Sequence, residues 1–142
     1  MSSQTPSEVG ALVLRVSLGA MYIAHSLVLK YFTFTLAGTA QFFASLGLPP
    51  ALAYVVFWSE LIGGVLLVLG VWPRAVALAL VPVLAGALWT HAGNGWVFSA
   101  ANGGWEYPLF LIAVSVVQAL VGDGAYALRP TPDLRGLQTR AA

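Results

Sequence analysis

Four long apolar stretches dominate the sequence and constrain what this chain can fold into. They cover residues 9–29, 51–71, 75–90 and 106–121. A helix needs about 20 apolar residues to cross the hydrocarbon core of a bilayer. Hydrophobic residues make up 59% of the 142 residues and charged residues only 8%, whereas soluble domains carry about 25% charged residues. We therefore exclude a soluble globular domain and a disordered chain, and predict an all-α integral membrane four-helix bundle in contact with lipid.

The connections between these stretches differ in length and character. Residues 36–46 predict a short helix between spans 1 and 2, ended by Gly47 and Pro49. This helix is too short to cross a bilayer, so we expect it at the interface or re-entrant. Residues 92–104 are rich in glycine and asparagine and predict a loop. Pro82 is expected to kink the third span.

Basic residues near the span ends predict the orientation, because cytoplasmic loops carry an excess of Lys and Arg. Four spans place both termini on one side. That side holds most of the basic residues, whereas the opposite side holds Lys30. The polar start of the chain has no basic region typical of a cleaved signal peptide, so the first span is expected to be retained. We predict a multi-pass protein of the bacterial inner membrane with both termini cytoplasmic, on the side of Arg15, Arg74, Arg129, Arg135 and Arg140.

Ionisable residues inside the spans are the candidate functional residues, because each costs about 2.5–3.5 kcal/mol on insertion scales and needs a partner. At a rise of 1.5 Å per residue, five of them fall in the outer half of the bundle. Arg15 lies deeper, about 22 Å from the outer end, and is expected to reach toward Glu60 or to snorkel to the cytoplasmic side. The five candidates of the outer half are His25, Lys30, Glu60, His91 and Glu106.

Two glycines on the second span predict how it packs. Gly63 and Gly64 follow Glu60 by three and four residues and share its helix face. Small residues allow a neighbouring helix to approach closely in a membrane. We therefore expect Glu60 to face a helix interface rather than lipid.

The polar cluster is compatible with several roles. It is a structural polar network, a small-molecule or quinone cavity, or part of a proton or solute pathway. Haem ligation by His25 and His91 and a metal site that adds the two glutamates have no supporting spacing, so no metal is expected. The chain has no cysteine, which excludes disulfides, iron–sulfur clusters and thiol catalysis in it. A net charge of +1 gives no basis for nucleic-acid binding.

An ordered set of short motifs resembles the DoxX family of small bacterial membrane proteins, from about Leu14 to Leu128. The sequence departs from the family pattern at two places. Ser26 stands where many members have glycine, and after the last Gly-x-Gly the residues Ala127-Leu128-Arg129 stand in place of a Ser-Leu-Asp-type ending. The motifs are Leu14-Arg15 with Gly19, His25 and Lys30, then Gly47-Leu48-Pro49, Glu60-Leu61-Ile62-Gly63-Gly64, Leu69-Gly70, His91, Trp105-Glu106-Tyr107 and Gly122-Asp123-Gly124.

The resemblance implies a four-helix membrane domain over residues 9–123, with tails at 1–8 and 124–142. Some members of the family look like subunits of quinone-linked redox complexes, including a thiosulfate:quinone oxidoreductase, and others are associated with oxidative-stress complexes. It implies a membrane subunit that binds a quinone, carries no covalent or metal cofactor, and assembles with redox subunits or a second copy. A non-enzymatic scaffold and, less favoured, a small-solute or proton transporter are the alternatives. The family's recurrent positions fall on Arg15, His25, Lys30, Glu60 and His91.

Overall fold

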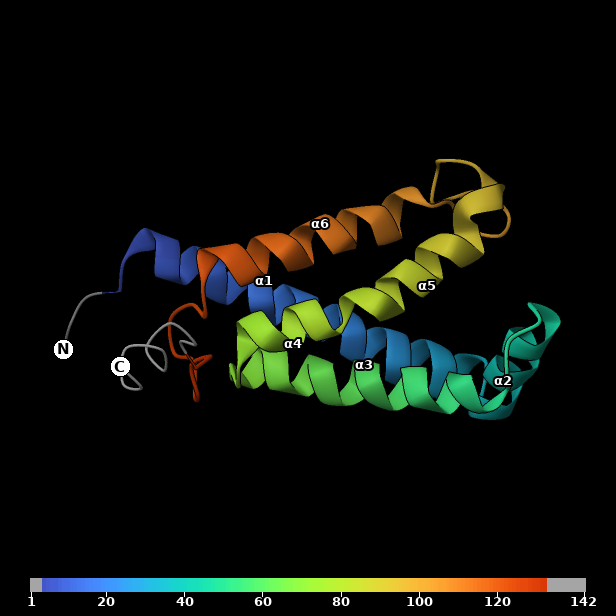
Figure 1. Ribbon diagram of the computed structural model, residues 1–142, viewed down its shortest axis with the longest axis horizontal. Helices are drawn as coiled ribbons and strands as arrows, with labels where there is room; N and C mark the ends of the chain where they lie inside the picture. Colours follow the sequence, from blue (N-terminus) through green and yellow to red (C-terminus); the bar gives the residue numbers. More distant parts are fainter. Residues whose placement is uncertain (1–3, 133–142) are drawn as a thin grey trace, which may run out of the picture.

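Helices form every regular element of the computed structural model, which describes residues 4–132. Figure 1 shows them as one elongated bundle. The predicted all-α fold is confirmed, since the described residues contain no strand and only one isolated bridge, between Val71 and Arg129. The elements in order are α1 (Pro6–Ile23), η1 (Ala24–Thr33), α2 (Leu36–Ser45), α3 (Ala51–Leu69), α4 (Pro73–Ala79), α5 (Val81–His91), η2 (Ala92–Asn94) and α6 (Glu106–Val121).

The first span begins earlier and ends later than its apolar stretch indicates. Thr5 caps α1 in a capping box, in which the Glu8 N–H donates to Thr5 Oγ1 and the Thr5 N–H donates to Glu8 Oε2. α1 then continues without interruption into η1, which is a π-helix of 10 residues. Together they form a helical span of 28 residues, Pro6–Thr33.

Three helical spans are long and apolar enough to cross a membrane. They are Pro6–Thr33, Ala51–Leu69 and Pro73–Asn94. α6 is also apolar but shorter, with 16 residues, or about 24 Å at the helical rise. A short helix is accommodated by local thinning of the bilayer or by flanking interfacial residues. The bounds of α6 are those predicted from the sequence, and α2 matches the predicted short helix to within one residue.

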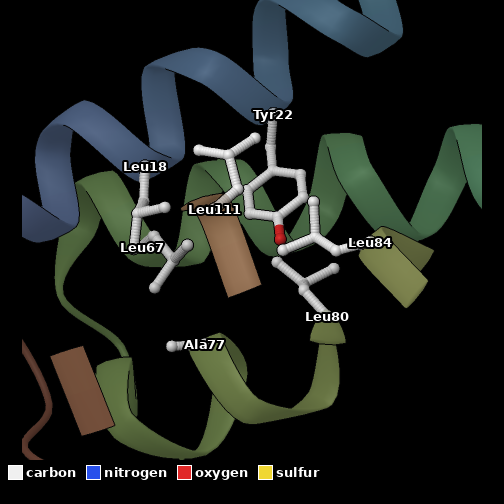
Figure 2. Packing of buried hydrophobic residues seen from close by; sticks show 7 residues of the cluster. All are labelled: Leu18, Tyr22, Leu67, Ala77, Leu80, Leu84 and Leu111. Atoms are coloured by element: carbon white, nitrogen blue, oxygen red, sulfur yellow. The ribbon is translucent and has the colours of Figure 1, made fainter. Parts of the chain in front are cut away.

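The third span is divided, as Pro82 predicts. α4 ends at Ala79 and α5 starts at Val81. Pro82 has no N–H to donate to the carbonyl of residue 78, so the helical hydrogen bonding is interrupted there. Figure 2 shows Leu80 and Leu84 flanking this break, with the ring of Tyr22 reaching toward them from α1. The core thus joins α1, α3, the α4–α5 break and Leu111 of α6.

The two ends of the bundle differ. At the end that we call the terminal end, the start of α1, the end of α6 and the turn between α3 and α4 lie together (Figure 1). Residues 122–132 cross this end, where the Ala125 N–H donates to the Glu8 carbonyl and the Trp72 N–H donates to the Arg129 carbonyl. At the opposite end, called the loop end, lie α2 and the loop of residues 95–105.

The residues predicted as tails are therefore partly integrated into the bundle. α1 starts at Pro6 instead of residue 9, and residues 124–132 pack on the helices. The Asp123 carboxylate accepts hydrogen bonds from the backbone N–H and the hydroxyl of Thr131, at 2.9 and 2.6 Å. Arg135 and Arg140, used to predict the orientation, lie outside the described residues.

Candidate ligand-binding cavity

A cavity of about 510 Å³ lies in the half of the bundle toward the loop end. This volume is in the range of small-molecule sites, about 300–1,000 Å³. Residues of α1, η1, α2, α3, α5 and α6 line it, and most of them are apolar. Six of the lining residues carry polar groups suited to a ligand: Tyr22, His25, Lys30, Glu60, His91 and Tyr107.

An ion pair stands on the wall of this cavity. Lys30 Nζ of η1 lies 2.7 Å from Glu60 Oε2 of α3, and the two side chains are only 17% and 8% exposed. The Thr39 hydroxyl of α2 donates to the Thr35 carbonyl at 2.9 Å and lies 3.4 Å from the Lys30 carbonyl oxygen. The ion pair therefore links η1 to α3 on the cavity wall, with α2 beside it.

The π-helical geometry of η1 sets the direction of its polar side chains. Hydrogen bonds five residues apart, such as the Phe34 N–H to the Leu29 carbonyl at 2.8 Å, place residues five apart nearly above one another. In an α-helix such residues are about 140° apart around the axis. His25 and Lys30 are five residues apart, and both line the cavity.

His25 is held against the backbone and against an aromatic ring. Its Nδ1 lies 3.0 Å from the Met21 carbonyl oxygen. Because a carbonyl oxygen only accepts, Nδ1 is the donor, and Nε2 remains available for another partner. The imidazole also stacks on Tyr107 of α6, with ring centroids 6.2 Å apart and planes inclined by 23°.

His91 lies at the rim of the cavity, where α5 ends. Its Nδ1 is 2.9 Å from the Asn102 carbonyl oxygen, which also accepts from the side chain of Asn94. These contacts fix the ring to the loop of residues 95–105. His91 thus connects the cavity to the loop end of the bundle.

Glu106 is separated from the other candidates. Its Oε1 accepts a hydrogen bond from the Phe98 N–H at 2.8 Å, and Glu106 is absent from the described lining of the cavity. Two backbone hydrogen bonds also close the loop: the Trp105 N–H donates to the Gly95 carbonyl, and the Glu106 N–H donates to the Trp96 carbonyl. Glu106 begins α6 at the loop end, and its carboxylate turns to the loop instead of the cavity.

Arg15 takes neither of the two courses expected from the sequence. It is 1% exposed and its guanidinium donates to the carbonyls of Leu67 and Val68, both at 3.0 Å, and to Ala125 at 2.7 Å. The first two carbonyls belong to the last turn of α3, where a positive charge is favourable. Arg15 therefore joins α1, α3 and the segment 122–132 at the terminal end, away from Glu60.

The glycines of α3 lie at two different contacts. A Cβ atom on Gly64 would lie 2.8 Å from the Gly19 carbonyl oxygen of α1, and one on Gly63 would lie 2.7 Å from the Leu80 side chain. A Cβ on Gly19 would meet the Gly64 carbonyl at 2.6 Å. α1 and α3 thus approach with their backbones nearly in contact at Gly19 and Gly64, one turn from Glu60.

Sequence reasoning did not select the two tyrosines of the cavity. The Tyr22 hydroxyl is buried and has no hydrogen-bond partner among the described residues. Tyr107 follows Glu106 and stacks on His25. The position of Tyr22, three residues before His25 on the same helix face, was the available signal. Within residues 4–132 no group of three or more His, Asp or Glu side chains is arranged to hold a metal ion.

The fold and the cavity define a small helical membrane protein with a largely apolar pocket between its helices, onto which a few polar groups converge. Among such proteins the chain belongs to the DoxX family, whose sequence pattern matches residues 10–93. A relative from Bacillus subtilis (strain 168), named "Putative oxidoreductase CatD", is 37% identical over 123 residues, which is 87% of this chain and 87% of the relative. No solved structure matches the chain.

Proposed function

We propose that this chain is the membrane subunit of a quinone-linked redox complex and that its cavity binds the quinone ring. The observation that carries the proposal is the Lys30–Glu60 ion pair on the wall of a largely apolar cavity of about 510 Å³. Apolar sites with a few convergent polar groups are typical of small-molecule binding. The name of the Bacillus relative, which includes the word oxidoreductase, supports the same class of activity.

The residues of the cavity fit the hydrogen-bonding needs of both redox forms of a quinone. The Lys30 ammonium donates to a carbonyl oxygen of the oxidised form, and the Glu60 carboxylate accepts from a hydroxyl of the reduced form. When the reduced form is oxidised it releases two protons, of which His25 Nε2 accepts one and the Glu60 carboxylate accepts the other. The two electrons pass to a redox centre of a partner subunit, because the side chains of this chain are not ordinary electron carriers.

The orientation of the protein is proposed from the basic residues at the terminal end. Arg74 and Arg129 lie in the part of the chain that forms the terminal end, with the Arg129 guanidinium over the Trp72 ring at 5.1 Å. We propose that this end faces the cytoplasm of a bacterial cell. The cavity then lies in the outer half of the inner membrane.

The test compares two identical substitutions in purified protein reconstituted in nanodiscs. Glu60→Gln removes the acceptor charge of the cavity, whereas Glu106→Gln changes a carboxylate bound to the loop. A charged hydrogen bond contributes about 1.5–3 kcal/mol, so Glu60→Gln should weaken quinone binding at least about tenfold and Glu106→Gln should not. Absence of saturable quinone binding by the unmodified protein would refute the proposal.

A scaffold role is the second candidate, and one observation favours it. Lys30 and Glu60 satisfy each other directly and link η1 to α3, which is what a structural ion pair does. The apolar double variant Lys30→Met/Glu60→Leu separates the two roles. If the ion pair is only structural, the double variant should keep its stability and its complex with partner subunits. If the cavity is a quinone site, the double variant should stay folded but lose quinone binding.

A further inference from the structure

We propose that the ligand enters from the side, out of the bilayer, and that its apolar tail lies along a groove between α3 and α4. This inference rests on the proposed function, since it takes the ligand to be a quinone with a long prenyl tail. The structural basis is a second hollow that adjoins the cavity at the same helix.

From the divided third span we infer a side opening between α3 and α5. α4 packs on both α3 and α6, but α5 packs on α6 and scarcely contacts α3. Figure 1 shows α5 diverging from α3 beyond the break and approaching α6 toward the loop end. Both walls of the resulting gap line the cavity, with Val55 and Ser59 on α3 and Val83 and Gly86 on α5. The cavity is therefore bounded on this side by apolar, lipid-facing helices.

The groove continues from this opening over the surface of α3. It has a volume of about 570 Å³ and shares Val55 and Ser59 with the cavity. From Val55 it runs to Leu66, about 16 Å at the helical rise, between α3 and the side chains of Val76 and Ala79 on α4. Its lining is predominantly apolar, as an acyl or prenyl chain requires.

The direction of the groove matches an amphiphile in a bilayer. The polar groups of the cavity lie toward the loop end, and the groove leads away from them along α3 to Leu66, near the terminal end. A membrane-dissolved quinone has its ring near the interface and its tail in the hydrocarbon core. The neutral head of a quinone also suits the Lys30–Glu60 pair better than a phosphate does, because a phosphate would face the Glu60 carboxylate.

The test measures binding of two quinones with the same ring, one with a long prenyl tail and one without a tail, in nanodiscs. Val55→Trp narrows the junction between cavity and groove. Val13→Trp on α1 is the matched control, since Val13 and Val55 are both 59% exposed. We expect Val55→Trp to weaken binding of the tailed quinone at least tenfold more than it weakens binding of the tailless quinone.

A second variant fills the opening from α5. A Cβ on Gly86 meets nothing within 4 Å, and the same holds for Gly10 on α1, so Gly86→Leu and Gly10→Leu form another matched pair. Gly86→Leu should repeat the selective loss of the tailed quinone. If both quinones weaken equally, or neither changes in Val55→Trp and Gly86→Leu, the side route is refuted and the quinone site stands. If the unmodified protein binds neither quinone, the proposed function fails, and this inference with it.

Discussion

Lys30 and Glu60 are thirty residues apart in the sequence, yet Lys30 Nζ and Glu60 Oε2 lie 2.7 Å apart between η1 and α3. The contact depends on the π-helical form of η1 and on the close approach of α1 to α3 at Gly19 and Gly64. It is thus a sensitive measure of whether the loop half of the bundle is correctly assembled.

Removing one member of this pair should cost more than removing both. Lys30→Met leaves the Glu60 charge without its partner, and breaking a buried pair in this way costs about 3–5 kcal/mol. Replacing both residues, in Lys30→Met/Glu60→Leu, should recover most of that loss. Thermal unfolding in detergent, arranged as a double-mutant cycle, measures the difference. If the loss of the double variant equals the sum of the two single losses, the two side chains do not stabilise each other, and the expectation is wrong.

Arg15→Lys should loosen the terminal end. The planar guanidinium reaches two carbonyls of α3 and the carbonyl of Ala125 together, which a single ammonium group cannot do with the same geometry. Loss of one such charged hydrogen bond should destabilise the protein by about 2 kcal/mol. Limited proteolysis at residues 122–132 should become faster. Arg129→Lys, at an exposed position, is the control and should leave the cleavage rate nearly unchanged.

Gly19→Val should disrupt the contact between α1 and α3. Even a Cβ at this position would lie 2.6 Å from the Gly64 carbonyl oxygen, and such overpacking costs about 1–3 kcal/mol or more. Gly10→Val, on the same helix but facing open space, should have a much smaller effect. The measurement is the midpoint of thermal unfolding for both variants. A midpoint of Gly19→Val equal to that of Gly10→Val would contradict the close backbone approach.

Pro82→Ala should straighten the third span. With an N–H at residue 82 and no ring to obstruct it, the helix can continue from α4 into α5, which brings α5 toward α3. Because the chain has no cysteine, spin labels at Ser59→Cys and Ala87→Cys report one distance only. We expect that distance to shorten in Pro82→Ala. An unchanged distance distribution would mean that packing on α6, rather than the proline, holds α5 in place.

Much of the fold was predictable because its signals are local. Long apolar stretches, the helix ends at Gly47 and Gly122, and the break before Pro82 depend on a few neighbouring residues. α6 therefore has the bounds expected from the sequence. The π-helical form of η1 was not predicted, because a run of apolar residues carries the same hydropathy in an α-helix and in a π-helix.

The candidate site was predicted only in part, because a position along a helix does not determine the direction of a side chain. Depth placed His25, Lys30, Glu60 and His91 in the same half of the bundle, and in the structure all four line one cavity. The same reasoning included Glu106, whose carboxylate instead binds the Phe98 N–H. The partners of Arg15 could not be anticipated, since one of them is a backbone carbonyl of residue 125 beyond the last helix.

The extra residue in each turn of η1 makes the length of this stretch as important as its composition. In an ordinary α-helix of the same length, with no charged group changed, Lys30 would lie about 140° from His25 around the helix axis, and its ammonium group would be directed away from α3. Deleting one residue between them would restore the shared face, because residues four apart are neighbours on the surface of an α-helix. The electrostatics of the pocket are thus encoded in a residue count, which a comparison of residue types alone would overlook.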